Sequence, residues 1–233
     1  MLAPGQGRQH FQGQMLDLER SALGGMDMAL GQVERVLDAL EHADQRLAQF
    51  VIADDDRIDG RYLEVHQGVL SLLALQAPVA GDLRVVAAVL YVINSIERVG
   101  DQCVNIAKLI PLAGRKPDPP DELCQRILRM GELARQELAQ ARRAFADRDV
   151  ALAQSLAEQD LEVNRLNREI FRLAVRAGAD PRLREWAMTM TLAARALERI
   201  GDNAVDIAEQ AIFMATGELR ELSPPLHSSP PGP

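Results

Sequence analysis

One segment of this sequence is present twice, and the repeat constrains the fold more than any other feature. Residues 96–108 read IERVGDQCVNIAK and residues 197–209 read LERIGDNAVDIAE, so the second copy begins 101 residues after the first. In both copies acidic or amide side chains recur at steps of four, which places them in one row along a helix. The chain is therefore an internal duplication, and its two halves are expected to share one fold.

The repeated row of acids carries an electrostatic cost. The first copy contains Glu97, Asp101 and Asn105, and the second contains Glu198, Asp202 and Asp206, followed by Glu209. Two like charges four residues apart destabilise a helix by about 0.2–0.5 kcal/mol. A bound cation would offset this repulsion, whereas an ordinary acidic helix face in water needs no ligand. The spacing alone leaves both interpretations open.

The composition favours helices over sheets. Aromatic residues make up only 3% of the 233 residues, Ala and Leu are abundant, and Gly and Pro cluster at a few places. Such a composition is typical of long helices that pack through small and aliphatic side chains. A chain of this length forms one domain or two of about 100 residues each, and the duplication favours two. The predicted fold class is all-α.

The charge, the cysteines and the hydropathy argue against several classes of protein. A net charge of −8 argues against a nucleic-acid-binding protein, because phosphate contacts require a basic surface. Cys103 and Cys124 form no CxxC motif, which indicates neither a zinc site nor a disulfide framework. The longest apolar run, residues 85–93, is shorter than the roughly 20 residues that span a bilayer. The N-terminus also lacks the features of a signal peptide. We therefore expect a cytoplasmic protein that reaches a membrane only through its partners.

Apolar residues recur at steps of three and four along most of the chain, which predicts six long helices. The clearest stripe is Val85, Val89, Val92, Ile96, Val99, Cys103, Ile106 and Ile110, and the last helix repeats it as Trp186, Met190, Ala193, Leu197, Ile200, Ala204, Ile207 and Ala211. The predicted helices cover residues 9–41, 44–76, 82–110, 121–145, 149–177 and 181–217. Asp44 is expected to cap the second helix. Short turns make neighbouring helices antiparallel, so we predict two pseudo-symmetric three-helix bundles.

Proline and glycine divide the chain into its expected parts. Residues 111–120, PLAGRKPDPP, cannot continue a helix and are predicted to link the two halves. The first three-helix repeat then covers residues 9–110 and the second covers residues 121–222. Residues 1–8 are expected to be a flexible N-terminus, and the Pro-rich residues 223–233 a disordered tail.

The turns also indicate which polar residues face one another. Asp59 and Glu97 lie at similar distances on the two sides of a turn near residue 79. Asp55 and Asp101 are level in the same way, so four carboxylates are expected to meet on adjacent helices. In the second half, a turn near residue 180 brings together the equivalent set Asp160, Asn164, Glu198 and Asp202. If a cation binds to these oxygen ligands, magnesium, calcium, manganese or iron would suit them.

Other kinds of chemistry find no support in the sequence. A ferritin-like di-iron centre needs Glu-x-x-His on two helices, and the four histidines do not complete that pattern. Cys103 falls on the apolar stripe, where a core cysteine is expected rather than a reactive one. A Gly-rich phosphate loop and a nucleophile motif are both missing from the sequence. We therefore do not expect an enzyme.

The repeated motifs resemble those of the PhoU phosphate-signalling family. The resemblance rests on ERVGDxxxNIA at residues 97–107, ERIGDxxxDIAE at residues 198–209 and LALQAPVAGDLR at residues 73–84. It extends over roughly residues 9–222. It implies a fold of six helices in two pseudo-symmetric three-helix bundles.

The resemblance also implies a function. PhoU-like proteins are cytoplasmic regulators without catalytic activity, and they often form homodimers. They are expected to connect the ATPase subunit of the phosphate ABC transporter to a sensor histidine kinase, and to repress the phosphate-starvation response when phosphate is plentiful. Two alternatives remain open: a helical metal-storage or redox protein, and a PhoU-like regulator of another transporter or a cation channel.

Paired acidic motifs of this family hold iron, zinc, manganese or magnesium. The resemblance assigns the metal to Asp55, Asp59, Glu97 and Asp101 in the first bundle, and to Asp160, Asn164, Glu198 and Asp202 in the second. Asn105, Asp206 and Glu209 are candidates for additional metal or docking contacts. Asn164 stands where an Asp is expected, so the second site is predicted to bind metal more weakly.

Overall fold

The computed structural model describes residues 6–75, 78, 80–113 and 122–222 of the chain. All regular structure within these ranges is helical, which confirms the predicted all-α class. The helices are α1 (Gln6–His42), α2 (Gln45–Asp54), α3 (Asp56–Leu75), α4 (Ala80–Leu109), the short 3-10 helix η1 (Ile110–Leu112), α5 (Glu122–Asp147), α6 (Val150–Gln154), α7 (Leu156–Ala177) and α8 (Arg184–Thr216).

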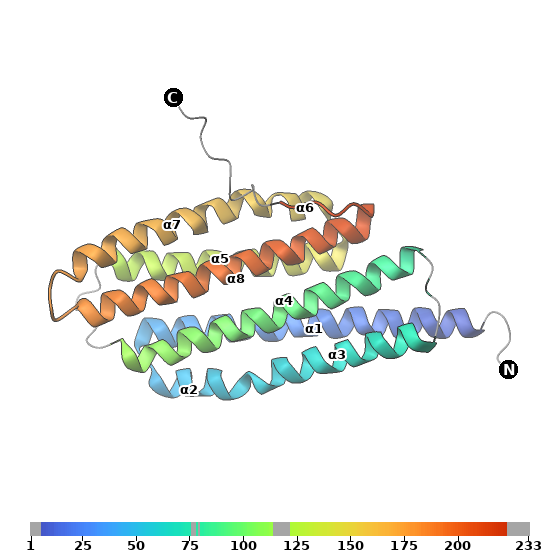
Figure 1. Cartoon of the computed structure of the whole chain (residues 1–233), viewed down its shortest axis with the longest axis horizontal. Coiled ribbons are helices and arrows are strands. Elements are labelled where there is room, and N and C mark those ends of the chain that lie inside the picture. Colours follow the sequence, from blue (N-terminus) through green and yellow to red (C-terminus); the bar gives the residue numbers. More distant parts are fainter. Residues whose placement is uncertain (1–5, 76–77, 79, 114–121, 223–233) are drawn as a thin grey trace, which may run out of the picture.

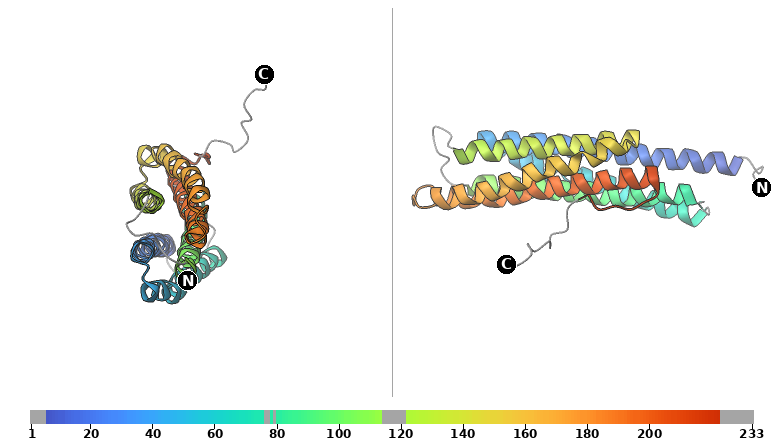
Figure 2. Two further views of the ribbon diagram at one scale, coloured as in Figure 1. Left: turned by 90° about the vertical axis from the view of Figure 1, so that its left-hand side faces the viewer. Right: turned by 90° about the horizontal axis from the view of Figure 1, so that it is seen from above.

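The helices form two long bundles that lie side by side (Figure 1). Helices α1 to α4 make the first bundle and α5 to α8 make the second, as the duplication predicts. The bundles pack together mainly through α4 against α8, with α1 against α5 as a second contact. The end-on view in Figure 2 shows α1 and α5 on one side and α4 and α8 on the other.

The core is built from the two apolar stripes that the sequence predicts. Every residue of the α4 stripe and of the α8 stripe is buried. They belong to one apolar cluster that runs through both bundles. Cys103 is fully buried in this cluster, and the burial raises the pKa of its thiol. The expectation of a core cysteine is confirmed.

Both bundles use the same turn between their first and second helices. Ala43 and Arg148 each have a positive φ of 53°. The Asp44 carboxylate accepts hydrogen bonds from the backbone N–H groups of Arg46 and Leu47 in the first turn of α2, which confirms the predicted cap. Asp149 accepts one in the same way from the N–H of Leu152. These turns lie 105 residues apart, so residues of α1 and α5 correspond at that same offset.

Two of the six predicted helices are interrupted. The expected helix 44–76 breaks at Asp55 between α2 and α3, and the expected helix 149–177 breaks at Ser155 between α6 and α7. An amide side chain from the first helix of each bundle bonds to a backbone carbonyl next to the break. Gln32 Nε2 donates to the carbonyl of Val51 at 3.2 Å, and Gln140 Nε2 donates to that of Leu152 at 2.9 Å. These tertiary hydrogen bonds are not visible in the helical periodicity.

Three predicted segments meet the limits of the described residues. The linker 111–120 is described only as far as residue 113, and the tail 223–233 lies outside the described residues. Within the predicted flexible segment 1–8, residues 6–8 already belong to α1, so the helix begins earlier than predicted. None of the described helices is both long and apolar enough to cross a lipid bilayer.

Candidate functional site

The first acidic patch lies where the α2–α3 junction approaches α4. Asp55 and Glu97 are half-buried, whereas Asp59 and Asp101 are exposed. Burial raises the pKa of Asp55, and the negative charges of Asp59 and Asp101 raise it further. Burial also raises the pKa of Glu97, with added repulsion from Asp101, Asp59 and Asp55. The four carboxylates thus act on one another as a single electrostatic cluster.

The glycine of the repeated motif allows this cluster to form. A Cβ atom at Gly100 would lie 2.7 Å from Asp55 Oδ1, which is too close for any side chain. Asp55 Oδ1 also accepts a hydrogen bond of 3.1 Å from Gln32 Nε2 on α1. The glycine in ERVGD therefore lets the carboxylate from the α2–α3 junction rest directly on the α4 backbone.

The second acidic patch occupies the equivalent place between α7 and α8 but is more deeply buried. Asp160 is 5% exposed and Glu198 is 9% exposed, while Asp202 remains exposed. Burial raises the pKa of Asp160 to about 6, with repulsion from Asp202 as a further cause. Asn164 Nδ2 donates a hydrogen bond of 2.6 Å to Asp160 Oδ2. The amide of Asn164 thus stabilises the ionised form of its neighbour.

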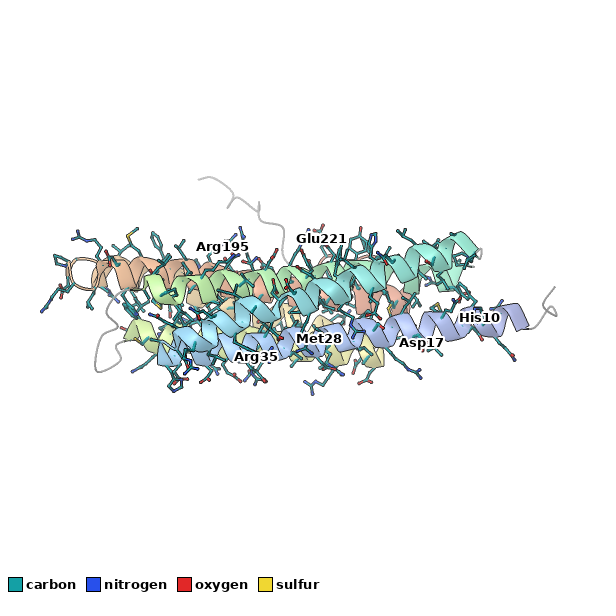
Figure 3. The ribbon with its side chains drawn as sticks, turned by 90° about the horizontal axis from the view of Figure 1, so that it is seen from below. His10, Asp17, Met28, Arg35, Arg195 and Glu221 are labelled. Atoms are coloured by element: carbon teal, nitrogen blue, oxygen red, sulfur yellow. The ribbon has the colours of Figure 1, made fainter. Side chains whose placement is uncertain are left out.

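Glu198 forms a salt bridge, whereas Glu97 forms none with the described residues and feels the charge of Arg98 without a direct ion pair. The carboxylate of Glu198 forms an ion pair with Arg195, one turn earlier on α8. In the first bundle the arginine contact is a different one, since Arg35 on α1 pairs with Asp54 on α2 at 2.9 Å. Figure 3 shows Arg195 and Arg35 on opposite sides of the molecule. Any ion that uses Glu198 as a ligand would have to compete with this arginine.

The second patch contains a carboxylate that sequence analysis missed. Glu137 on α5 is 1% exposed, and neither of its carboxylate oxygens has a hydrogen-bond partner among the described residues. A Cβ atom at Gly201 would lie 2.7 Å from Glu137 Oε2 and 3.2 Å from Asp160 Oδ1. Burial, followed by repulsion from Asp160 and Asp202, raises the pKa of Glu137 to about 8.

The first bundle has glutamine at the position that corresponds to Glu137. Gln32 and Glu137 each lie 11 residues before the turn residue with positive φ. Gln32 Oε1 is also buried and has no hydrogen-bond partner among the described residues; it lies 3.4 Å from where a Cβ of Gly100 would stand. Gln32 and Glu137 are separated by the same 105 residues as the two turns. Applying this offset to the first helix of each bundle would have identified the pair from the sequence. A second signal was the position of Glu137 directly beside Leu138, an apolar residue that α5 buries.

The three additional candidates lie at the margins of the patches. Asn105 is exposed, and its side chain donates a long bond of 3.5 Å to Gln102. Burial raises the pKa of Asp206, while Arg98 from the first bundle opposes that shift. Glu209 Oε1 accepts a hydrogen bond of 2.6 Å from the backbone N–H of Leu222. Glu209 therefore already has a structural partner, whereas Asp206 lies near the contact between the bundles.

The chemistry of the residues fits a hard cation. Carboxylate and amide oxygens are the ligands that magnesium, manganese and ferric iron prefer, and each patch contains buried oxygens without a partner among the described residues: Gln32 Oε1 in the first, Glu137 Oε1, Glu137 Oε2 and Asp160 Oδ1 in the second. In the described part of the chain, however, no three His, Cys, Asp or Glu side chains already converge as a ligand shell. Binding therefore requires side-chain rotations, and the metal assignment stays a prediction.

Comparison with known proteins gives consistent results. The family model for the PhoU domain matches the chain twice, at residues 25–110 and 127–211. A phosphate-specific transport system accessory protein PhoU homolog from Caulobacter vibrioides is 36% identical over 204 residues, which are 87% of each chain. A homolog named PhoU homolog 2 from Mycobacterium tuberculosis is 32% identical over 205 residues, covering 85% of this chain and 91% of the other.

Solved structures agree with the family match. The crystal structure of PhoU from Pseudomonas aeruginosa superposes with a TM-score of 0.84 at 30% sequence identity, covering 89% of this chain and 100% of the other. The regulatory protein PhoU from Streptococcus pneumoniae gives a TM-score of 0.82 at 26% identity, covering 90% and 99%. With two copies of the domain, and with relatives and structures matched over nearly their whole length, this chain belongs to the PhoU family.

Proposed function

We propose that this chain is a cytoplasmic regulatory adaptor of phosphate transport, without catalytic activity of its own. In this proposal it binds the ATPase subunit of a phosphate ABC transporter and a sensor histidine kinase, and represses phosphate uptake and the starvation response when phosphate is plentiful. The observation that carries the proposal is the match of two PhoU domains to relatives that are named as accessory proteins of phosphate transport. Transporter and kinase would supply sensing and signalling, and this chain would connect them.

An exposed apolar groove on the second bundle supports a role in protein binding. The groove lies between α7 and α8 and is lined by Phe171, Val175, Met188 and Leu192, each more than half exposed. Exposed apolar clusters of this kind mark interaction surfaces in many proteins. We assign the groove to a partner of the adaptor. If the groove instead forms the predicted homodimer interface, gel filtration of the Leu192→Glu variant described below would detect the loss of the dimer.

We further propose that the two acidic patches bind divalent or trivalent metal ions. The ligands would be Asp55, Asp59, Glu97 and Asp101 in the first bundle and Asp160, Asn164, Glu198 and Asp202 in the second. A bound cation neutralises the mutual repulsion of the carboxylates and cross-links the helices that carry them. In this way the metal would stabilise the bundles that present the docking surface.

A pull-down with purified full-length chain tests the adaptor. We expect it to retain both the transporter ATPase subunit and the sensor kinase. Leu192→Glu places a charge in the apolar groove and is expected to weaken the retention of one partner by tenfold or more, since a buried unpaired charge costs several kcal/mol. Leu16→Glu, at a residue of similar exposure on α1, is the matched control. Retention of neither partner by the unmodified chain would contradict the adaptor.

The second candidate is a metal-storage or redox protein, which the buried acids of the second bundle favour. In that case the carboxylates would act directly on bound iron. An oxidase assay with ferrous iron separates the two candidates, because the adaptor is expected to show no turnover above the rate in buffer. Retention of a different transporter in the pull-down would instead indicate a PhoU-like regulator with another partner.

A further inference from the structure

The two patches distribute their charges differently over the same framework. The position on the second helix of the bundle is Asp59 in the first patch and Asn164 in the second. The position on the first helix is Gln32 in the first patch and Glu137 in the second. The first patch therefore has its acid on the second helix and its amide on the first, and the second patch has the reverse. Each patch retains four carboxylates.

The burial of Glu137 lowers the stability of the metal-free protein. Its carboxyl group is buried on α5, and both oxygens lack hydrogen bonds from any described residue. Arg195, which forms an ion pair in this patch, pairs with Glu198 instead. A buried polar group without a partner destabilises the fold, and an unpaired buried charge does so more strongly. Such a residue calls for a partner that is not part of the chain.

Glu137 is directed into the patch rather than away from it. Glu137 Oε2 and Asp160 Oδ1 both lie within 3.2 Å of the point where a Cβ of Gly201 would stand. They approach that point from α5 and α7, two different helices. Two carboxylate oxygens from separate helices thus meet at the backbone of the α8 motif, where the charge of Asp202 acts on both carboxyl groups.

We propose that Glu137 is a metal ligand of the second bundle and supplies the carboxylate that Asn164 lacks. The inference rests on the proposed metal binding of this bundle. It revises the expectation from the sequence that the second site is the weaker one, because both sites then present four carboxylates. The ligand class is a hard or borderline cation held by oxygen atoms.

The experiment uses the full-length chain with its first site disabled by Glu97→Gln and Asp101→Asn. Calorimetric titrations with Mn²⁺ and with Zn²⁺ then report the second bundle alone. Adding Glu137→Gln is expected to weaken binding by roughly tenfold or more, because affinity follows the number of charged ligands. Adding Asn164→Asp to that variant restores the fourth carboxylate and is expected to recover most of the loss. Glu132→Gln, at a half-buried acid of the same helix that pairs with Arg135, is expected to leave metal affinity unchanged.

The melting temperature of the metal-free protein separates a lost ligand from a damaged fold. Glu137→Gln replaces a buried carboxyl group with an amide of similar volume. The metal-free variant is therefore expected to melt at a higher temperature than its parent and to bind metal less tightly. Equal affinities with and without Glu137→Gln would overturn the inference and leave metal binding intact. A parent chain that binds neither metal would overturn the inference together with the proposed metal site of this bundle.

Discussion

The two bundles share a backbone arrangement but differ in how deeply the acidic side chains of their patches are buried. In the first patch two carboxylates are exposed and two are half-buried, and helix α1 contributes the buried, neutral Gln32. In the second patch Glu137, Asp160 and Glu198 are all buried. The motif glycine performs the same task in both, since it lets a carboxylate rest against the helix backbone. The two patches thus share one geometry, but the acid that is exposed as Asp59 in the first has its counterpart in the buried Glu137 of the second.

The largest effect is expected from filling the space at the motif glycine. Gly201→Val would drive its side chain into Glu137 and Asp160, neither of which can swing into water. Overpacking of this kind costs roughly 1–3 kcal/mol, and chemical denaturation would show it as a lower midpoint. Gly60→Val on α3, where nothing lies within 4 Å, is the control and should leave stability nearly unchanged. Equal effects of the two substitutions would contradict the tight contact at Gly201.

The pH dependence of stability should separate the two bundles next. Burial raises the pKa of Glu137 from its usual 4.5 to about 8, so the folded state binds the proton more tightly than the unfolded chain does. Metal-free stability is therefore highest at mildly acidic pH and falls as the pH rises from about 4.5 to 8. Asp160, raised to about 6 from 3.8, adds to the fall over the lower part of this range.

Glu137→Gln is the matched test of that pH dependence. We expect thermal unfolding between pH 5 and 8 to show a flatter profile for the variant, with a gain of roughly 1–3 kcal/mol at pH 8. For a chain of this size, each kcal/mol raises the melting temperature by about 2–4 °C. A variant whose profile runs parallel to that of the unmodified chain would show that Glu137 is not the group responsible.

Making the first bundle resemble the second sharpens the comparison. Gln32→Glu would remove the hydrogen bonds from Gln32 Nε2 to Val51 and Asp55 and add a fifth carboxylate to the first patch. We expect the metal-free variant to lose roughly 1–3 kcal/mol of stability, because a buried donor is replaced by a buried charge. Added Mn²⁺ should recover more of the stability of this variant than of the unmodified chain, which a thermal shift assay measures.

The smallest effect concerns the ion pair of Glu198. Arg195 is largely exposed, so its removal by Arg195→Gln is expected to change stability by less than about 1 kcal/mol. The same change releases the Glu198 carboxylate, and metal binding by the second bundle should tighten. Arg182→Gln, which breaks an exposed pair with Asp180 far from the patch, provides the control. Identical metal affinities for both variants would exclude competition by Arg195.

Much of this fold follows from local sequence patterns. The apolar stripes of α4 and α8 fix the buried faces, Asp44 fixes a helix start, and the repeated motif fixes the pseudo-symmetry. The breaks at Asp55 and Ser155 could not be predicted in this way, because they depend on hydrogen bonds from Gln32 and Gln140, which are distant in sequence.

The patches were only partly accessible to sequence reasoning. Acids on the second and third predicted helices of each half could be proposed as facing pairs, because the turns set how far along each helix they lie. Glu137 was missed because spacing along one helix says nothing about which side chain from a third helix reaches the same point. The burial that distinguishes the two patches likewise depends on packing between helices.

Metal content measured by elemental analysis tests the central claim most directly, when the unmodified chain is compared with Glu97→Ala and Glu198→Ala. If the acidic rows are ligands, the unmodified protein retains metal in both bundles, and each substitution removes the metal of its own bundle while leaving the other. A metal content that neither substitution changes, or a chain that carries no metal after purification and reloading, would show that the repeated acids serve another purpose.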